Sequence, residues 1–116
     1  MNLGSDLITD QQKLVLLLIS TEKGFNSVYI LVKLFDRSDF PAEIDKAIAP
    51  LVRMEFIKPS GWFENKTVSE YKATKRGRSF VQNNLEGCEI LDYVKKMPNP
   101  ELLLKITEEL VRDQFK

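Results

Sequence analysis

The sequence predicts a mostly helical α+β domain with a single β-hairpin, on the strength of three observations. Apolar residues recur at helical spacing in several segments along the chain. Two short segments with strand character, residues 57–63 and 67–73, flank the polar residues Glu64-Asn65-Lys66. Helical spacing resumes after Thr74. At 116 residues the chain has the length of one domain with one modest core.

The composition excludes several classes of function. Hydrophobic residues make up 43% and charged residues 29%, as in ordinary globular proteins. Histidine, the commonest general base and transition-metal ligand, is missing, and the single cysteine, Cys88, can form neither an internal disulfide nor a structural zinc site. The longest apolar run, Leu14 to Ile19, is too short to span a membrane, and the first ten residues do not resemble a signal peptide. We therefore expect a cytoplasmic protein that is not an enzyme and needs no cofactor, metal or membrane.

The first helix is expected over Asp10 to Glu22. Thr9 and Gln12 have the spacing of a capping box, and Gly24 suits the position just after the helix. Because residues 14–19 are all apolar, this helix should be buried on nearly every side. Two interpretations remain open: the helix contacts a second subunit as well as its own core, or it is the central core helix of a monomer.

Two further helices are expected before the hairpin. The second would be capped by Asn26 or Ser27 and has apolar residues at helical spacing, namely Val28, Leu31, Val32 and Phe35; a strand is the competing assignment, because Tyr29 and Ile30 are aromatic and β-branched. The third would begin at Pro41 and bury one face, made of Ile44, Ala47, Ile48 and Leu51. Pro50 predicts a kink or a restart near Ala49.

In the hairpin, Tyr71 and Ala73 should face the core, and Pro59 and Gly61 should make the first strand irregular. We expect Trp62 to pack between hairpin and core; an exposed Trp here would instead suit a partner interface. Thr74 can cap the following helix, which Gly87 should end.

The remaining residues should form two helices separated by Pro98-Asn99-Pro100, the last of them spanning Glu101 to Phe115. Because little domain is left to cover its apolar stripe, we expect residues 87–116 to be a dimerisation extension of a domain at residues 1–86. The alternative is that the last helix folds back on its own domain. The expected interface residues are Leu103, Ile106, Leu110 and Val111.

Two segments resemble winged helix-turn-helix transcriptional regulators of the multiple-antibiotic-resistance (MarR) and PadR-like groups. Residues 70–78 resemble the pattern Tyr-x-Leu-Thr-x-x-Gly-(Arg/Lys): Tyr71, Thr74 and Gly77 match, and Ala73 replaces the usual Leu. Residues 48–57 are similar to Ile/Leu-x-x-Leu-x-x-x-Gly-Leu-Ile, with Glu55 in place of the Gly and Phe56 in place of the second Leu. The resemblance covers about Thr9 to Val81 and implies a winged helix, here followed by the C-terminal helical extension. It also implies a sequence-specific regulator of transcription that binds double-stranded DNA, which the expected extension would make a homodimer.

The distribution of charge supports a DNA interface at the hairpin, which would be the wing. The chain has no net charge, yet residues 58–78 contain six bases and two acids. The residues expected to contact DNA from the wing and the turn after it are Lys58, Asn65, Lys66, Lys72, Lys75, Arg76 and Arg78. The residues expected from the third helix and the turn before it are Arg37, Ser38, Glu43 and Lys46. The alternative function is a winged-helix adaptor that binds protein and not DNA.

Overall fold

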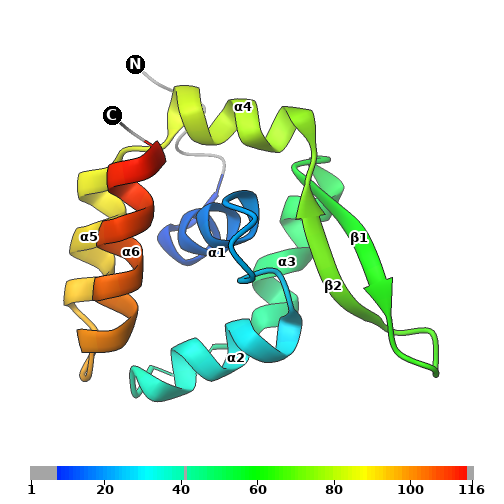
Figure 1. The fold of residues 1–116 in the computed structure, drawn as a ribbon, viewed down its shortest axis with the longest axis horizontal. Helices are drawn as coiled ribbons and strands as arrows, with labels where there is room; N and C mark the ends of the chain where they lie inside the picture. The colour runs from blue at the N-terminus through cyan, green and yellow to red at the C-terminus, as the bar shows by residue number, and fades with distance from the viewer. Residues whose placement is uncertain (1–7, 41, 115–116) are drawn as a thin grey trace.

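The computed structural model describes residues 8–40 and 42–114 and has the expected α+β class, with mostly helical secondary structure (Figure 1). The elements in these ranges are α1 (Asp10–Ser20), α2 (Val28–Arg37), α3 (Ile44–Arg53), β1 (Ile57–Trp62), β2 (Val68–Ala73), α4 (Lys75–Asn84), α5 (Gly87–Lys95) and α6 (Glu101–Gln114). Within the same ranges, the helices lack the combination of length and hydrophobicity that crossing a bilayer requires.

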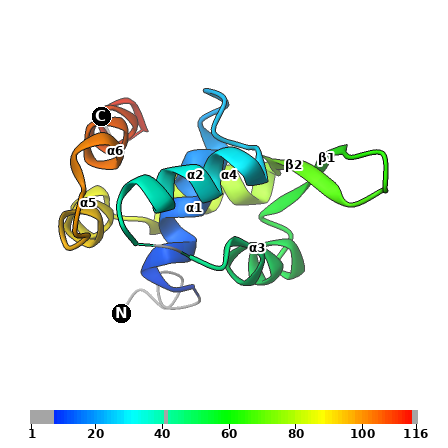
Figure 2. The same cartoon turned by 90° about the horizontal axis from the view of Figure 1, so that it is seen from below.

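Helix α1 lies at the centre, and the other elements are arranged around it (Figures 1 and 2). The residues from Leu14 to Ile19 are at most 1% exposed. α1 contacts α3, α4, α5, α6 and β2. A helix that is apolar all round is stable only when every side is covered, and here the chain itself covers it. α1 is therefore the central core helix, with almost no surface left for a second subunit.

Side-chain caps begin the first two helices as predicted. The Gln12 N–H donates to the Thr9 hydroxyl oxygen at 3.2 Å, and the Thr9 N–H donates to the Gln12 side-chain oxygen at 2.8 Å. The Ser27 hydroxyl oxygen accepts from the Ile30 N–H at 3.4 Å, so this segment is a helix and not a strand. The predicted end of α1 was two residues too late: Ser20 is its last residue, and Glu22 has the positive φ of 56°.

Helix α3 ends in a tight turn at Glu55, where the winged-helix pattern described above has glycine. The Phe56 N–H donates to the Leu51 C=O, and the Glu55 N–H donates to the Val52 C=O, both at 2.9 Å. These two bonds define a Schellman motif, in which the residue at position Glu55 adopts a left-handed conformation. The φ of Glu55 is 62°. Glycine adopts this conformation without strain, and a Glu residue in it costs about 1 kcal/mol.

The start of α3 and the effect of Pro50 differ from the prediction. α3 begins at Ile44, because Phe40 still belongs to the turn that ends α2, its N–H bonded to the Phe35 C=O at 3.1 Å. Pro41 lies outside the described residues. The helix continues through Pro50, so the predicted restart was wrong; only three helical residues follow Pro50. The predicted apolar face is correct, since Ile44, Ala47, Ile48 and Leu51 are all buried.

The hairpin pairs β1 with β2 antiparallel, and the register is irregular around Pro59 and Gly61, as predicted. Ala73 is buried and Tyr71 half-buried on the inner face. The segment before α2 also joins the hairpin: Ser27 forms a β-bridge with Glu70, and the Tyr71 N–H donates to the Asn26 C=O at 3.0 Å. This third, short stretch of extended chain attaches the hairpin to the helical core.

A tight junction joins the end of α3 to the start of α4. The Thr74 N–H donates to the Phe56 C=O at 2.9 Å, and the Thr74 hydroxyl donates to the Glu55 C=O. The same hydroxyl oxygen accepts from the Gly77 N–H at 3.0 Å and so caps α4. A Cβ atom at Gly77 would lie 2.0 Å from the Phe56 carbonyl oxygen. Thr74 and Gly77 thus both pack against the same group, the Phe56 carbonyl.

The C-terminal helices belong to the same core. Gly87 begins α5 and does not end α4, because the buried Leu85 turns the chain inward first. Pro98-Asn99-Pro100 separates α5 from α6, as predicted. Asn99 also caps α2: its N–H donates to the Ser38 C=O at 3.1 Å, and its side-chain amide donates to the Arg37 C=O at 3.0 Å. Residues of α5 and α6 form one hydrophobic cluster with α1.

The close packing at this junction predicts that adding one methyl group at Gly77 destabilises the fold. Gly77→Ala should lower the free energy of unfolding by about 3 kcal/mol, because the new Cβ clashes with a backbone oxygen that cannot move without disrupting the turn. Ser79→Ala, an exposed position on the same helix, is the matched control and should change it by less than about 0.5 kcal/mol. Urea unfolding followed by circular dichroism measures both; equal midpoints would contradict the proposed contact.

Candidate nucleic-acid interface

The exposed face of the hairpin presents two lysines directly opposite each other. The strand register pairs Lys58 with Lys72, and both side chains are exposed. In the described residues, neither ammonium group has a carboxylate within 4.0 Å. Like charges at directly opposite positions destabilise a hairpin. The pair therefore costs stability, as binding residues commonly do.

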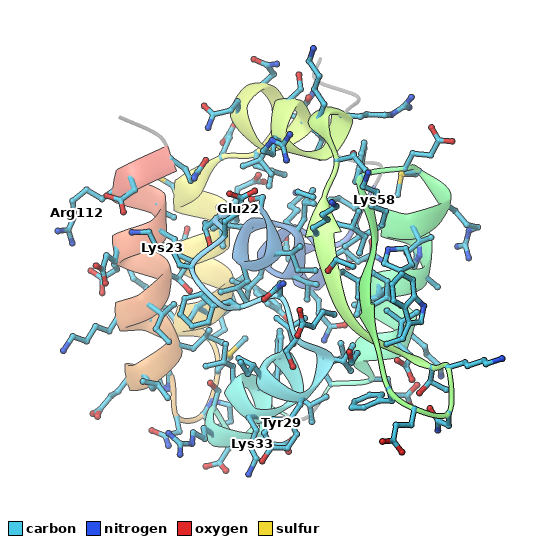
Figure 3. The ribbon with its side chains drawn as sticks, turned by 45° about the vertical axis from the view of Figure 1, so that its right-hand side comes forward. Glu22, Lys23, Tyr29, Lys33, Lys58 and Arg112 are labelled. Carbon is cyan, nitrogen blue, oxygen red and sulfur yellow. The ribbon has the colours of Figure 1, made fainter. Side chains whose placement is uncertain are left out.

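The start of α4 brings more positive charge beside Lys58. Lys75 and Arg76 are exposed and line the same hollow as Lys58. The hollow has a volume of about 420 Å³ and is completed by Val52, Glu55, Ile57, Pro59 and Thr74. Figure 3 shows Lys58 on the hairpin side of the molecule and Arg112 of α6 on the opposite side. We call Lys58, Lys72, Lys75 and Arg76 the basic surface.

The two arginines of α4, Arg76 and Arg78, differ in the interactions that their guanidinium groups make within the chain. The Arg78 guanidinium donates to the Ala73 C=O at 2.9 Å, so part of its hydrogen-bonding capacity supports the end of β2. The Arg76 guanidinium lies 5.8 Å from the centre of the Phe56 ring and is otherwise exposed. An exposed cation–π contact of this kind is weak, about 0.5–1 kcal/mol. Arg76 therefore remains available to a partner, and Arg78 less so.

Asn65 and Lys66 lie at the far end of the hairpin, away from the basic surface. The side-chain oxygen of Asn65 accepts from the Thr67 N–H at 3.1 Å and from the Thr67 hydroxyl at 2.7 Å. Lys66 has a φ of 70° and an exposed side chain. The Asn65 oxygen thus shapes the turn, whereas the Lys66 ammonium group extends the positive charge to the tip.

The residues predicted on α3, Glu43 and Lys46, lie at the start of that helix together with the acidic Asp45. Lys46 makes an ion pair with Glu43 in which both side chains are exposed, so it contributes little stability. Asp45 lies near the hairpin: burial first, and the Asp45 carboxylate second, raise the pKa of the Tyr71 phenol above its ordinary value. Glu43, Asp45 and Lys46 also line a second hollow of about 420 Å³ between α2 and α3.

Of the two residues predicted to contact DNA from the turn before α3, Arg37 and Ser38, only Arg37 has an exposed side chain. Ser38 is 1% exposed, and its hydroxyl donates to the Leu34 C=O at 2.9 Å. It has no donor left for a base, so its assignment as a DNA contact was wrong. Arg37 is exposed, but it lies at the end of α2 beside Lys33 and Leu102, in a separate hollow of about 280 Å³.

Two of the residues predicted at a dimer interface lie in the chain's own core. Leu103 and Leu110 are at most 2% exposed and belong to the cluster that contains α1. Ile106 and Val111 are half-buried. Leu103 and Leu110 therefore have no surface for a second subunit, because α6 folds back on the domain. Dimerisation itself stays a prediction.

The prediction that Trp62 packs against the core was wrong. Trp62 is 59% exposed, and its neighbour Phe63 is 55% exposed. The two-residue alternation of the strand predicts this exposure, because it places Trp62 on the same outer face as Lys58 and Ser60. All three residues are exposed. The aromatic pair is thus a surface feature at the tip of the hairpin.

Removing one lysine of the cross-strand pair should stabilise the fold. Lys72→Thr deletes a like-charge contact and introduces a β-branched residue, so the free energy of unfolding should rise by about 0.5 kcal/mol at low salt. Repulsion between exposed charges is screened by salt. The gain should therefore shrink in urea unfolding experiments at 1 M salt, and a gain of the same size at both salt concentrations would exclude repulsion as its cause.

Dimerisation is tested by the mass of the intact chain in solution. Multi-angle light scattering should give 26.8 kDa, twice the 13.4 kDa of one chain. Ile106→Glu, at a half-buried position on α6, should reduce that mass if α6 forms the interface. A mass of one chain for the unmodified protein would contradict the prediction.

Comparison of the chain with family models, with characterised proteins and with solved structures gave no match. Among the described residues, the strongest functional feature is the basic surface.

Proposed function

We propose that this chain is a winged helix-turn-helix protein that regulates transcription by binding double-stranded DNA. The basic surface carries the proposal: four cations lie together without carboxylate partners among the described residues, on a chain whose net charge is zero. Such a concentration of like charge is unfavourable unless a polyanion neutralises it. The phosphate backbone of DNA is such a polyanion.

The order of elements supports the winged-helix part of the proposal. Three helices precede a two-stranded hairpin, and a fourth helix follows it. The bridge between Ser27 and Glu70 adds a short strand between the first and second helices. Helix, strand, helix, helix, hairpin is the order typical of winged helices. On this assignment the hairpin is the wing and α3 the recognition helix.

The charges assign different tasks to the wing and to α3. The basic surface would contact phosphates, which gives affinity and orientation but no sequence information. Sequence would be read from the start of α3, where Lys46 can donate to guanine and Glu43 can accept from cytosine. The ion pair between these two side chains would have to open first. Because it is exposed, opening it costs little.

A protein-binding adaptor is the second candidate, favoured by the apolar part of the hollow beside the basic surface, namely Val52, Ile57 and Pro59. The two functions differ in their dependence on salt. Binding to DNA releases counterions, and its affinity falls steeply as salt rises. Burial of apolar surface is not weakened in this way.

Fluorescence anisotropy with a labelled mixed-sequence duplex tests the proposal. Affinity should fall with salt at a log–log slope of about −0.9 for each phosphate neutralised. The double variant Lys58→Thr/Lys72→Thr should bind every duplex more weakly and lower the slope by about 2. Lys95→Thr/Lys105→Thr removes the same charge from exposed positions on α5 and α6 and should bind like the unmodified protein. Absence of binding at low salt would refute DNA binding and favour the adaptor.

A further inference from the structure

The tip of the hairpin carries two adjacent aromatic side chains that the rest of the chain leaves in water. Trp62 and Phe63 are both more than half exposed. Among the described residues, neither is part of the hydrophobic core or of an aromatic pair. Large apolar side chains that lie together on a surface are typical of binding sites. The tip is therefore a place where a partner would bury apolar surface.

The backbone beneath these rings is already ordered. Trp62 is paired with Val68 across the hairpin. The Phe63 N–H donates to the Thr67 C=O, and the Phe63 C=O accepts from the Lys66 N–H, both at 2.9 Å. A partner that binds the rings does not have to order the loop first, which lowers the entropic cost of binding.

The placement of the two rings favours a partner that can enclose the tip. Trp62 is the last residue of β1, and Phe63 directly follows it and continues the cross-strand bonding, its N–H donating to the Thr67 C=O. Successive side chains of chain paired in this way point to opposite faces. Both faces of the tip are thus apolar. A flat protein surface would cover only one of them, whereas two bases of a nucleic-acid strand can stack on both.

The charges around the rings favour nucleic acid over a neutral partner. Lys66 lies at the tip and Lys58 and Lys72 on the outer face, so the hairpin has three cations against two exposed carboxylates, Glu64 and Glu70. A strand of DNA presents planar bases and phosphates at regular spacing, so it matches the aromatic rings and the ammonium groups together. An acidic peptide would match only the ammonium groups.

We propose that Trp62 and Phe63 stack on unpaired bases, so that the protein prefers DNA in which an unpaired stretch adjoins a duplex. This inference rests on the proposed DNA binding: the basic surface holds the duplex, and the tip adds the second contact. Bases inside an intact duplex must be unstacked before an aromatic ring can reach them, at an energetic cost. Unpaired bases are accessible without that cost.

Trp62 is the only tryptophan of the chain, so its fluorescence reports on the tip alone. The protein is titrated at low salt with an intact duplex, with the same duplex containing a central bubble of unpaired thymines, and with a thymine single strand. Trp62 emission should be quenched by the bubble and the single strand, and much less by the intact duplex. Anisotropy of the labelled DNAs shows independently which of them bind.

Variants separate stacking from simple loss of surface. Trp62→Ala should lower the ratio of bubble affinity to duplex affinity by about ten-fold, because one stacking contact is lost. Trp62→Phe keeps a ring and should restore most of the ratio. Tyr29→Ala removes an exposed aromatic ring from α2 and should leave the ratio unchanged. Circular dichroism confirms that each variant is folded.

Two results would overturn the inference in different ways. Equal affinity for bubble and duplex DNA, with unchanged Trp62 emission, would reject stacking while the proposed DNA binding stands; the aromatic pair would then be assigned to a protein partner. If none of the three DNAs binds at low salt, the proposed function fails and this inference fails with it.

Discussion

The packing of the Phe56 carbonyl group against Thr74 and Gly77 is the constraint on which the basic surface depends. It joins the turn after α3 to the first turn of α4. The hairpin is the chain between these two points, so the contact closes it at its base. Stacking of Phe56 on Phe80, with ring centres 4.5 Å apart, reinforces the same junction. The positions of Lys58 on β1 and of Lys75 and Arg76 on α4 follow from this closure.

The surface that the junction presents is formed at the expense of stability. Lys58 and Lys72 repel each other across the strands, and Glu55 holds a left-handed backbone conformation that glycine would adopt more easily. The core offsets these costs, because the many apolar side chains of α1 are fully buried. Because the core supplies the stability and the charges lie on the hairpin surface, those charges can change without loss of the fold. Changes to the hairpin charges should therefore alter the free energy of unfolding only slightly.

Local features were predictable from the sequence, and features set by distant residues were not. The capping box at Thr9 and the apolar face of α3 depend on residues within two turns, and both were predicted correctly. Burial of Ser38 depends on α2 and on Asn99, which is 61 positions further along, and the burial of Leu103 depends on where α6 docks. The pairing of Lys58 with Lys72 required the strand register, which is the same on both sides of the irregularity at Gly61 and depends on how the turn closes the hairpin. Trp62 was placed wrongly because a large apolar residue was assumed to be buried, although the strand alternation indicated the outer face.

The central position of α1 has a consequence for how the chain folds during synthesis. The helix leaves the ribosome before α5 and α6, which cover part of it and follow some 70 to 90 residues later. The ion pair between Lys23 and Asp113 spans 90 positions and can form only after Asp113 has been synthesised. At ordinary rates of about 5–20 residues per second, the apolar helix would wait several seconds for its cover. During that time its apolar segment, which is buried in the finished fold, remains exposed to solvent.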